Sequence, residues 1–325
     1  MRVTATAPAK VILTGEHFVV YGEPAIVMAV NSRAYVTVSE RSDREIAVDS
    51  DLGLSCRFID CTPSPGSDER AVRALEPIRL AAESVFKFLG KRRGLNISVR
   101  SEIPMASGLG SSAAVTVSTV AAVGKLLGAP LSVEDIAQLP FEAESYVHVK
   151  PSGVDQTIST YGGVLVYRRG SPPKRLDVGA DVPLVVGNTG LPRITGQLVA
   201  TVRELRDRFP TAMSPLIKVG GEVTSLALEA LLKGDMVRLG ELMDMNHGLL
   251  QAMRVSNKAL DDLVYASKKA GALGAKLSGA GGGGCMIALS QPGEEERIAR
   301  AISQAGGVPL IARKSDRGVE VREER

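Results

Sequence analysis

Residues 104–114 read Pro-Met-Ala-Ser-Gly-Leu-Gly-Ser-Ser-Ala-Ala, and the rest of the chain is organised around this stretch. It follows an alternating segment at 95–100, which predicts a strand, and it leads into a run of small residues that predicts a helix from about Ser111. Gly108 and Gly110 lack a Cβ, so the backbone here can adopt bends closed to other residues and can approach a ligand closely. The stretch is therefore predicted to be a strand-to-helix turn.

The start of this predicted helix has the properties of an anion site. Ser111 and Ser112 lie where backbone N–H groups have no partner within the helix and where the helix dipole is positive. A glycine bend before such an N-terminus is suited to phosphate. The pattern is neither GxxxxGK[ST] nor GxGxxG, so the two common nucleotide fingerprints do not apply. An ordinary turn capped by serine is the alternative interpretation.

The composition is that of a globular protein with more than one domain. The chain has 325 residues, of which 44% are hydrophobic and 23% charged, enough for about two domains with sizeable cores. A formal net charge of only +3, without a sustained basic run, does not indicate nucleic-acid binding. The N-terminus lacks the apolar stretch of a signal peptide, and no segment is long enough to span a bilayer. The sequence therefore predicts a cytoplasmic protein with neither membrane nor nucleic acid as a partner.

Cysteine and histidine usage gives no pattern of metal ligands. Three cysteines leave one thiol unpaired in any disulfide scheme. Cys56 and Cys61 could pair, but reduced, buried thiols are the favoured interpretation, with Cys285 the third cysteine. Each histidine taken alone is interpreted as structural rather than as a ligand or a base; the three are His17, His148 and His247.

Periodicity predicts both strands and helices in the first half of the chain. Strands are expected at 2–8, 10–17 (broken at Gly15), 25–38, 45–48, 55–59, 95–100 and 164–167, with a loop at 61–68. Helices are expected at 72–89, with a break or kink at Pro77, at 113–127, and from Ser132 past Pro140 to about Val147.

A segment rich in proline and glycine, at 170–174, indicates a boundary, and we expect domains at 1–178 and 179–325. The second domain is expected to begin with a strand at 183–187. Helices should follow at about 195–209, 213–233, 235–254, 257–270 and 293–305, with a glycine-dense loop between two strands at 276–285, a strand at 308–313 and a charged end.

Three other segments have an unusual composition for structural elements. At 7–17, Lys10 in an apolar strand is followed by a Gly-Glu-His turn, which gathers a cation, an anion and an imidazole; a surface ion pair is the alternative. At 151–155, a glycine turn presents Asp155, although an aspartate in such a turn often only caps it. At 278–284, glycine is denser than a hairpin needs, which indicates close approach of the backbone to a ligand.

Taken together, these segments resemble the signatures of the GHMP kinase superfamily. Residues 7–17 resemble its first motif, 104–112 its ATP loop (P-x-x-x-G-L-G-S-S) and 276–285 its third motif. Within the superfamily, the resemblance is closest to the mevalonate kinase family of the archaeal type. Lys-Val-Ile-Leu-Thr-Gly-Glu-His, Pro-Ser-Gly-Val-Asp, Asn-Thr-Gly-Leu-Pro-Arg-Ile-Thr at 188–195 and the glycine-dense loop all resemble segments of that family. One departure is Ala9, where the family usually has glycine.

The resemblance implies a role for each segment. Asp155 resembles the catalytic aspartate and Lys10 its partner near the reacting hydroxyl, while Ser112 and Glu144 resemble the ligands of Mg²⁺. The residues that resemble the ATP loop are Pro104, Ala106, Ser107, Gly108, Leu109, Gly110, Ser111, Ser112 and Ala113. The residues that resemble contacts of the acceptor substrate are Lys10, Glu16, His17, Asp155 and Thr195.

The implied chemistry agrees with these residue types. Phosphoryl transfer requires mainly that two oxygens be held in line and that negative charge be neutralised. A carboxylate such as Asp155 can accept the proton of an alcohol, and an ammonium such as Lys10 can lower the pKa of that alcohol and keep the carboxylate ionised. Whether Asp155 is a true base or chiefly an electrostatic partner is left open.

The family further implies an α+β fold of two domains, an N-terminal ATP-binding domain with a left-handed βαβ unit and a C-terminal α/β domain, with the site between them and a homodimer as the assembly. The implied activity is ATP-dependent phosphorylation of the C5 hydroxyl of (R)-mevalonate in isoprenoid biosynthesis, with Mg²⁺ as cofactor. Alternatives within the superfamily are a phosphomevalonate kinase, a mevalonate-3-kinase or a mevalonate-diphosphate decarboxylase. A non-catalytic ligand sensor on the same fold is the more remote alternative.

Overall fold

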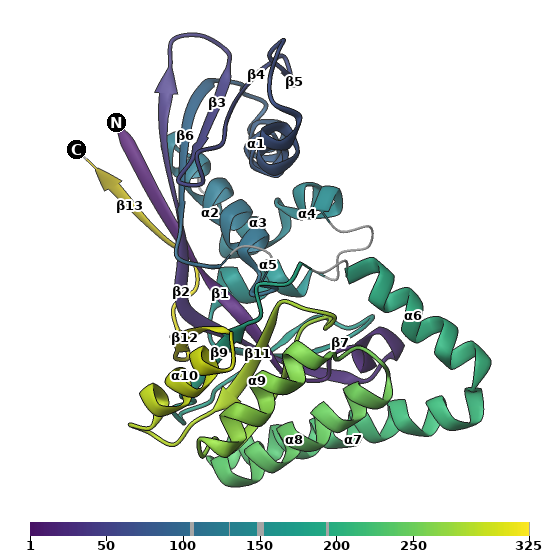
Figure 1. The fold of residues 1–325 in the computed structure, drawn as a ribbon. Coiled ribbons are helices and arrows are strands. Elements are labelled where there is room, and N and C mark those ends of the chain that lie inside the picture. The colour runs from purple at the N-terminus through teal and green to yellow at the C-terminus, as the bar shows by residue number, and fades with distance from the viewer. Residues whose placement is uncertain (105–106, 130, 148–152, 193–194, 325) are drawn as a thin grey trace.

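Two β-sheets organise the chain, and helices α1 to α5 lie on one side of the larger sheet (Figure 1). The computed structural model describes residues 1–104, 107–129, 131–147, 153–192 and 195–324. Within these ranges the first sheet has nine strands and the second has four.

The first sheet is built on two long antiparallel strands, β1 (Arg2–Thr14) and β2 (Pro24–Arg41). The predicted strands at 2–8 and 10–17 are one strand, with a register shift between Pro8 and Ala9. Proline lacks the N–H that a regular ladder needs, so the shift lets the strand continue past it. The predicted break at Gly15 is confirmed, since β1 ends at Thr14 and the short helix η1 (Phe18–Tyr21) follows the turn.

The remaining strands of the first sheet lie on both sides of this pair, in the order β13-β1-β2-β6-β3-β4-β5, with β7 paired to β2 and β8 to β7. Their bounds are β3 (Ile46–Ser50), β4 (Ser55–Ile59), β5 (Thr62–Pro63), β6 (Gly94–Ser101), β7 (Val164–Arg168), β8 (Lys174–Leu176) and β13 (Glu320–Glu324). Strands β3 and β6 pair in parallel, and α1 (Glu69–Leu89) lies between them in the chain. This is the βαβ unit of the N-terminal half; its left-handed sense stays a prediction.

The C-terminal segment is charged, as expected, but it also forms a strand, β13, that was not predicted. β13 pairs antiparallel with β1, which brings the two ends of the chain side by side (Figure 1). Its residues are charged and mostly exposed, so they show no apolar period from which a strand could be predicted. The pairing uses main-chain hydrogen bonds along the edge of β1, which do not depend on side chains. The short strands β5 and β8 were likewise not predicted.

Helix α2 (Ser111–Leu126) packs against β1 and β2 and is buried on nearly every side, as predicted. The single helix expected from Ser132 to Val147 is wrong: α3 (Val133–Gln138) ends before Pro140, and α4 (Phe141–Val147) begins after it. Leu139 before it keeps a helical backbone, but proline has no N–H to donate to the preceding turn, so the ladder of helical hydrogen bonds is interrupted at Pro140. The break expected at Pro77 does not occur, because α1 continues through it from Glu69 to Leu89; a kink there stays a prediction.

The second sheet has the order β10-β11-β9-β12, and all its pairings are antiparallel. Its elements and the helices around it are β9 (Leu184–Asn188), α6 (Thr195–Arg208), α7 (Pro210–Lys233), α8 (Met236–Ala252), α9 (Lys258–Lys269), β10 (Gly274–Ser278), β11 (Cys285–Leu289), α10 (Glu295–Gln304) and β12 (Val308–Ala312). The two sheets share one apolar core, because Leu13 and Met28 of the first sheet belong to the same buried cluster as Val186 and Ile287 of the second.

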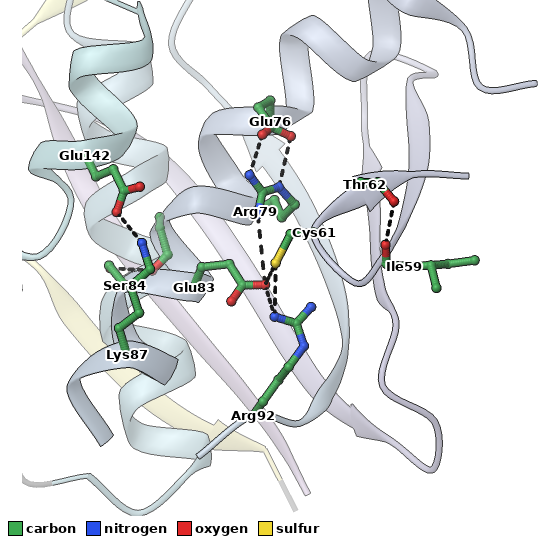
Figure 2. Close-up of polar contacts among 11 residues, drawn as sticks. Ile59, Cys61, Thr62, Glu76, Arg79, Glu83, Ser84, Lys87, Arg92 and Glu142 are labelled. Carbon is green, nitrogen blue, oxygen red and sulfur yellow. Dashed lines mark hydrogen bonds and ion pairs between the residues drawn. The ribbon is translucent and has the colours of Figure 1, made fainter. Parts of the chain in front are cut away.

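A polar cluster fixes the β4–β5 turn to α1 (Figure 2). Cys61, with a left-handed φ of 67°, donates from its thiol to Glu83 at 3.5 Å and accepts from Arg92 at 3.4 Å. Arg92 also pairs with the buried carboxylate of Glu83. The prediction of reduced thiols is confirmed, but Cys61 is exposed and not buried, because it lies at the tip of this turn.

Candidate active site

The turn between β6 and α2 has the geometry expected of an anion-binding loop. Gly108 and Gly110 adopt left-handed φ angles of 81° and 77°. Gly110 is the N-cap of α2, and no side chain caps the helix start, so its first N–H groups face the loop without a side-chain acceptor. Ser107 is buried and braces the loop, since its hydroxyl donates to the carbonyl of Pro104 at 2.6 Å.

Lys10 of β1 lies directly against this loop. Its backbone N–H donates to the carbonyl of Leu109 at 2.8 Å, and Leu109 is itself buried in the shared core. A Cβ on Gly110 would lie 2.8 Å from Cγ of Lys10. Glycine is therefore required here for two reasons, the left-handed backbone and the close approach of the lysine side chain.

The ammonium of Lys10 lies 3.2 Å from a carboxylate oxygen of Asp155. Asp155 is in the first turn of α5 (Val154–Tyr161), a helix that we did not predict and that begins after Gly153 in a left-handed conformation. The α5 helix is fixed to β1, because the hydroxyl of Ser159 donates to the carbonyl of Pro8 at 3.0 Å. Lys10 is almost buried, whereas the side chain of Asp155 is 30% exposed and accessible to a substrate.

A second carboxylate, that of Glu144 in α4, approaches the start of α2. The Ser112 hydroxyl donates to it at 3.0 Å and the Thr116 hydroxyl at 3.4 Å. Burial, and secondly the negative charge of Asp155, raise the pKa of Glu144 to about 7, against the lowering effect of Ser112, Thr116 and Lys10. The negative charges of the two carboxylates thus oppose one another, and a cation placed between them would relieve that repulsion.

Glu16 and His17 follow β1 in a turn that contacts the second sheet. The Glu16 carboxylate is buried and pairs with the ammonium of Lys276, at the third position of β10. Burial raises the pKa of Glu16 and lowers that of Lys276, and their mutual attraction opposes both shifts. The Nε2 atom of His17 lies 2.8 Å from the carbonyl of Ala280 in the glycine-dense loop. The structure therefore joins the first and third sequence motifs.

Some predicted positions fall outside the described residues. These are Ala106 of the ATP loop, His148, and Pro151 and Ser152 before Asp155. Thr195 is the first residue of α6, and its side chain is also outside the description. His247 is as expected a structural residue: its Nδ1 accepts from the backbone of Leu277 at 3.3 Å, and its Nε2 lies 3.2 Å from Asp261.

Comparison with known proteins identifies the family. The N-terminal domain family of the GHMP kinases matches residues 72–163, and their C-terminal family matches 227–308. The mevalonate kinase of Pyrococcus horikoshii is 43% identical over 332 aligned positions, which cover 99% of this chain and 98% of that protein. The chain belongs to the mevalonate kinase family of GHMP kinases.

Other members of the family agree with this assignment. The mevalonate kinase of Aeropyrum pernix is 38% identical over 98% of both chains. A crystal structure of L. major mevalonate kinase in complex with R-mevalonate superimposes with a TM-score of 0.82 at 29% identity, covering 95% of this chain and 94% of that one. The mevalonate kinase structure of Methanococcus jannaschii has the same TM-score at 26% identity, covering 96% and 98%. The expected fold of two GHMP kinase domains, with mixed α and β content, is thereby confirmed.

Two residues of this GHMP kinase contact the site but were not singled out in the sequence. Thr116 lies one helical turn after Ser112, and this i, i+4 spacing on a predicted helix indicates that the two side chains lie on the same face, which lies toward Glu144. Lys276 begins the third motif, but nothing in the sequence indicates that its ammonium is buried against Glu16.

Proposed function

We propose that this enzyme transfers the γ-phosphoryl group of ATP to the C5 hydroxyl of (R)-mevalonate, giving 5-phosphomevalonate and ADP. The observation that carries the proposal is the Lys10–Asp155 pair at 3.2 Å, directly beside the glycine loop, in a chain of the mevalonate kinase family.

Asp155 and Lys10 act on the acceptor hydroxyl. The partly exposed Asp155 accepts the proton of the hydroxyl as its oxygen attacks phosphorus. The ammonium of Lys10 stabilises the charge that develops on the attacking oxygen. The loop at 104–113 and the uncapped N-terminus of α2 hold the triphosphate, whose negative charge their N–H groups and the helix dipole favour.

Ser112 and Glu144 are suited to hold Mg²⁺. The donor set is a hydroxyl and a carboxylate, both oxygen ligands as Mg²⁺ prefers. Burial and the negative charge of the partly exposed Asp155 raise the pKa of Glu144 to about 7, so a cation beside Glu144 would favour its ionised form. When bound there, Mg²⁺ would neutralise charge on the phosphate oxygens. Thr116 keeps Glu144 oriented toward Ser112 through its own hydrogen bond.

The acceptor pocket is proposed to include Lys10, His17, Asp155 and Thr195. Glu16 was expected to contact substrate as well; this stays a prediction, and its observed partner is Lys276. Among the described residues of the site, Lys10 pairs with Asp155 and Lys276 pairs with Glu16. Neither ammonium is therefore free to bind the phosphate group of a phosphorylated acceptor. This favours mevalonate over its phosphorylated forms. The retained Lys10–Asp155 pair favours an enzyme over a ligand sensor.

The domain boundary is proposed at residues 1–178 and 179–325. Strands β1 to β8 lie in the first sheet and β9 to β12 in the second, although β13 returns to the first. A homodimer and a cytoplasmic location remain predictions. Among the described residues, no helix combines the length and apolar character needed to cross a membrane.

The decisive experiment is an assay of ADP release with mevalonate, its phosphorylated forms, galactose and homoserine as acceptors. Turnover with mevalonate alone, and a phosphorus NMR signal for a product phosphorylated at C5, is the expected result. A product phosphorylated at C3, or release of CO₂, would replace the proposal with one of the superfamily alternatives.

A further inference from the structure

The buried Lys276–Glu16 pair joins the two sheets at the end of β1. The side chains of both residues are at most 1% exposed, and Lys276 also donates to the carbonyl of Leu277 at 2.5 Å. Glu16 belongs to the turn after β1 in the first sheet, whereas Lys276 belongs to β10 in the second. Isolated charges are costly to bury, so each side chain depends on the other.

The turn that carries Glu16 is held in a conformation that its residues do not adopt readily. Gly15 has a φ of 104°, and a Cβ there would lie 2.4 Å from the carbonyl oxygen of Pro24. His17 has a φ of 61° and a ψ of −42° without being glycine, a strained conformation that persists only where surrounding contacts enforce it. The observed contacts are those of Glu16 with Lys276, of His17 with Ala280 at 2.8 Å, and of the Gly15 N–H with Asn246 Oδ1 at 3.1 Å.

The same contacts connect the turn to the reacting centre at one end and to the glycine-dense loop at the other. Lys10 and Thr14 belong to the same strand, β1, whose pairing with β2 shifts register between Ile12 and Thr14. The loop after β10 is joined to the turn through Ala280, and Ser278 exchanges hydrogen bonds of 3.2 Å with the backbone of Ile12. A change in the conformation of the turn at 15–17 would therefore shift Lys10 relative to the glycine-dense loop at 278–284.

We propose that Lys276 is a positioning residue for the phosphoryl transfer: by fixing Glu16, it holds the turn at 15–17 against the loop at 278–284 and so sets the width of the acceptor pocket beside Lys10. The inference rests on the proposed function for the identity of the acceptor. Lys276 does not touch the reacting atoms, because its ammonium is enclosed by Glu16 and Leu277. Lys276 contacts the turn at Glu16, whereas the ATP loop contacts β1 at Lys10, whose N–H donates to the carbonyl of Leu109.

An ordinary stabilising role is the competing explanation, and three variants separate the two. Lys276→Met removes the ammonium and leaves Glu16 buried without a partner, so it should lower both stability and activity. Lys276→Met with Glu16→Gln removes both charges, and such apolar or neutral replacements commonly restore stability. Lys258→Met is the control, because it breaks only an exposed lysine–aspartate pair on α9.

The measurements are the melting temperature, kcat, and the dissociation constants of ATP and mevalonate. For a positioning role, the double variant should regain the melting temperature while kcat/KM for mevalonate stays about 10–100-fold below wild type, as expected when a reacting group is displaced by a fraction of an ångström. ATP binding should change by less than about 3-fold, and hydrogen exchange at residues 15–17 should be faster, since the turn has lost an anchor.

A double variant with normal kcat/KM for mevalonate would overturn the proposal, as would an equal loss of ATP and mevalonate binding. If Lys276→Met does not fold, the double variant alone decides. Failure of the proposed function is distinguishable, because it is measured on the wild-type enzyme: should another acceptor prove to be the substrate, the same variants are compared with that acceptor.

Discussion

The ammonium of Lys10, in the first strand of the chain, lies 3.2 Å from the carboxylate of Asp155, in the first turn of α5. The two residues come from distant parts of the sequence. They are held close together where α5 packs on β1, with a hydrogen bond from the Ser159 hydroxyl to the Pro8 carbonyl. Their proximity makes them one unit, in which the ammonium lies beside the carboxylate that we propose as the proton acceptor.

Asp155→Asn should lower kcat by about 10²–10⁴, the usual effect of losing a positioned acid–base group. Lys10→Met should also lower kcat, because the remaining carboxylate loses its counter-charge. Since the two act together, the double variant should be far less impaired than the product of the single effects. Steady-state kinetics of the three variants, with Lys258→Met as a surface control, measure this. Strict multiplicativity would mean that the residues work independently.

Gly110→Ala should impair both ATP binding and turnover. The new Cβ would meet Lys10 at 2.8 Å, and the left-handed backbone adds about 1–2 kcal/mol of strain. Gly90→Ala is the matched control, because Gly90 has a similar left-handed φ of 64° but no atom within 4 Å of a Cβ. Both variants should lose the stability that the left-handed backbone costs, Gly110→Ala should lose more because of its contact with Lys10, and only Gly110→Ala should raise KM for ATP and lower kcat. Equal kinetics in both would show that the triphosphate does not lie against Gly110.

Glu144→Gln should raise the Mg²⁺ concentration needed for half-maximal rate by at least about 10-fold, since a charged oxygen ligand is lost. Stability should not fall at pH 8, because a buried carboxylate whose pKa is raised to about 7 destabilises the folded state once it ionises. Glu142→Gln is the control on the same helix, where the glutamate pairs with the exposed Lys87. Identical magnesium titrations of the two variants would assign Glu144 a purely structural role.

Stability below neutral pH should depend on His247. Burial lowers its pKa below the ordinary value of 6.5, although Asp261 opposes the shift. The unfolded chain therefore binds a proton at higher pH than the folded one, so stability is complete above about pH 6.5 and declines as pH falls through the folded pKa. Glu144 acts in the opposite direction, because its pKa is raised.

The test is the difference between wild type and His247→Asn, which keeps an acceptor for the Leu277 N–H that His247 Nδ1 now serves. Urea denaturation at pH 5.5 and 7.5 should show a smaller loss of stability on acidification in the variant. An equal loss in both proteins would place the acid sensitivity elsewhere.

Local features were predictable because their causes are local. The bend at Gly108 and Gly110, the end of β1 before Gly15 and the burial of α2 follow from missing Cβ atoms and from runs of small apolar side chains. The resemblance to the family signatures predicted, in addition, which of these segments lie together in one site. Pro140 carries a local signal of the same kind, because proline has no N–H for the helical ladder, and the single helix expected at 132–147 is divided there.

The amino-acid sequence by itself determined the glycine bends, most helices and strands, and the side chains available for phosphoryl transfer. Only the tertiary structure decided their partners. Glu16 could equally have faced solvent, and its burial against Lys276 depends on where two sheets meet; Glu144 reaches Ser112 because α4 packs beside α2. β13 becomes a strand because the edge of β1 offers unpaired main-chain groups. Such pairings join residues far apart in the chain, and the free energy that selects them comes from desolvation and packing around both partners, which no local pattern of residues records.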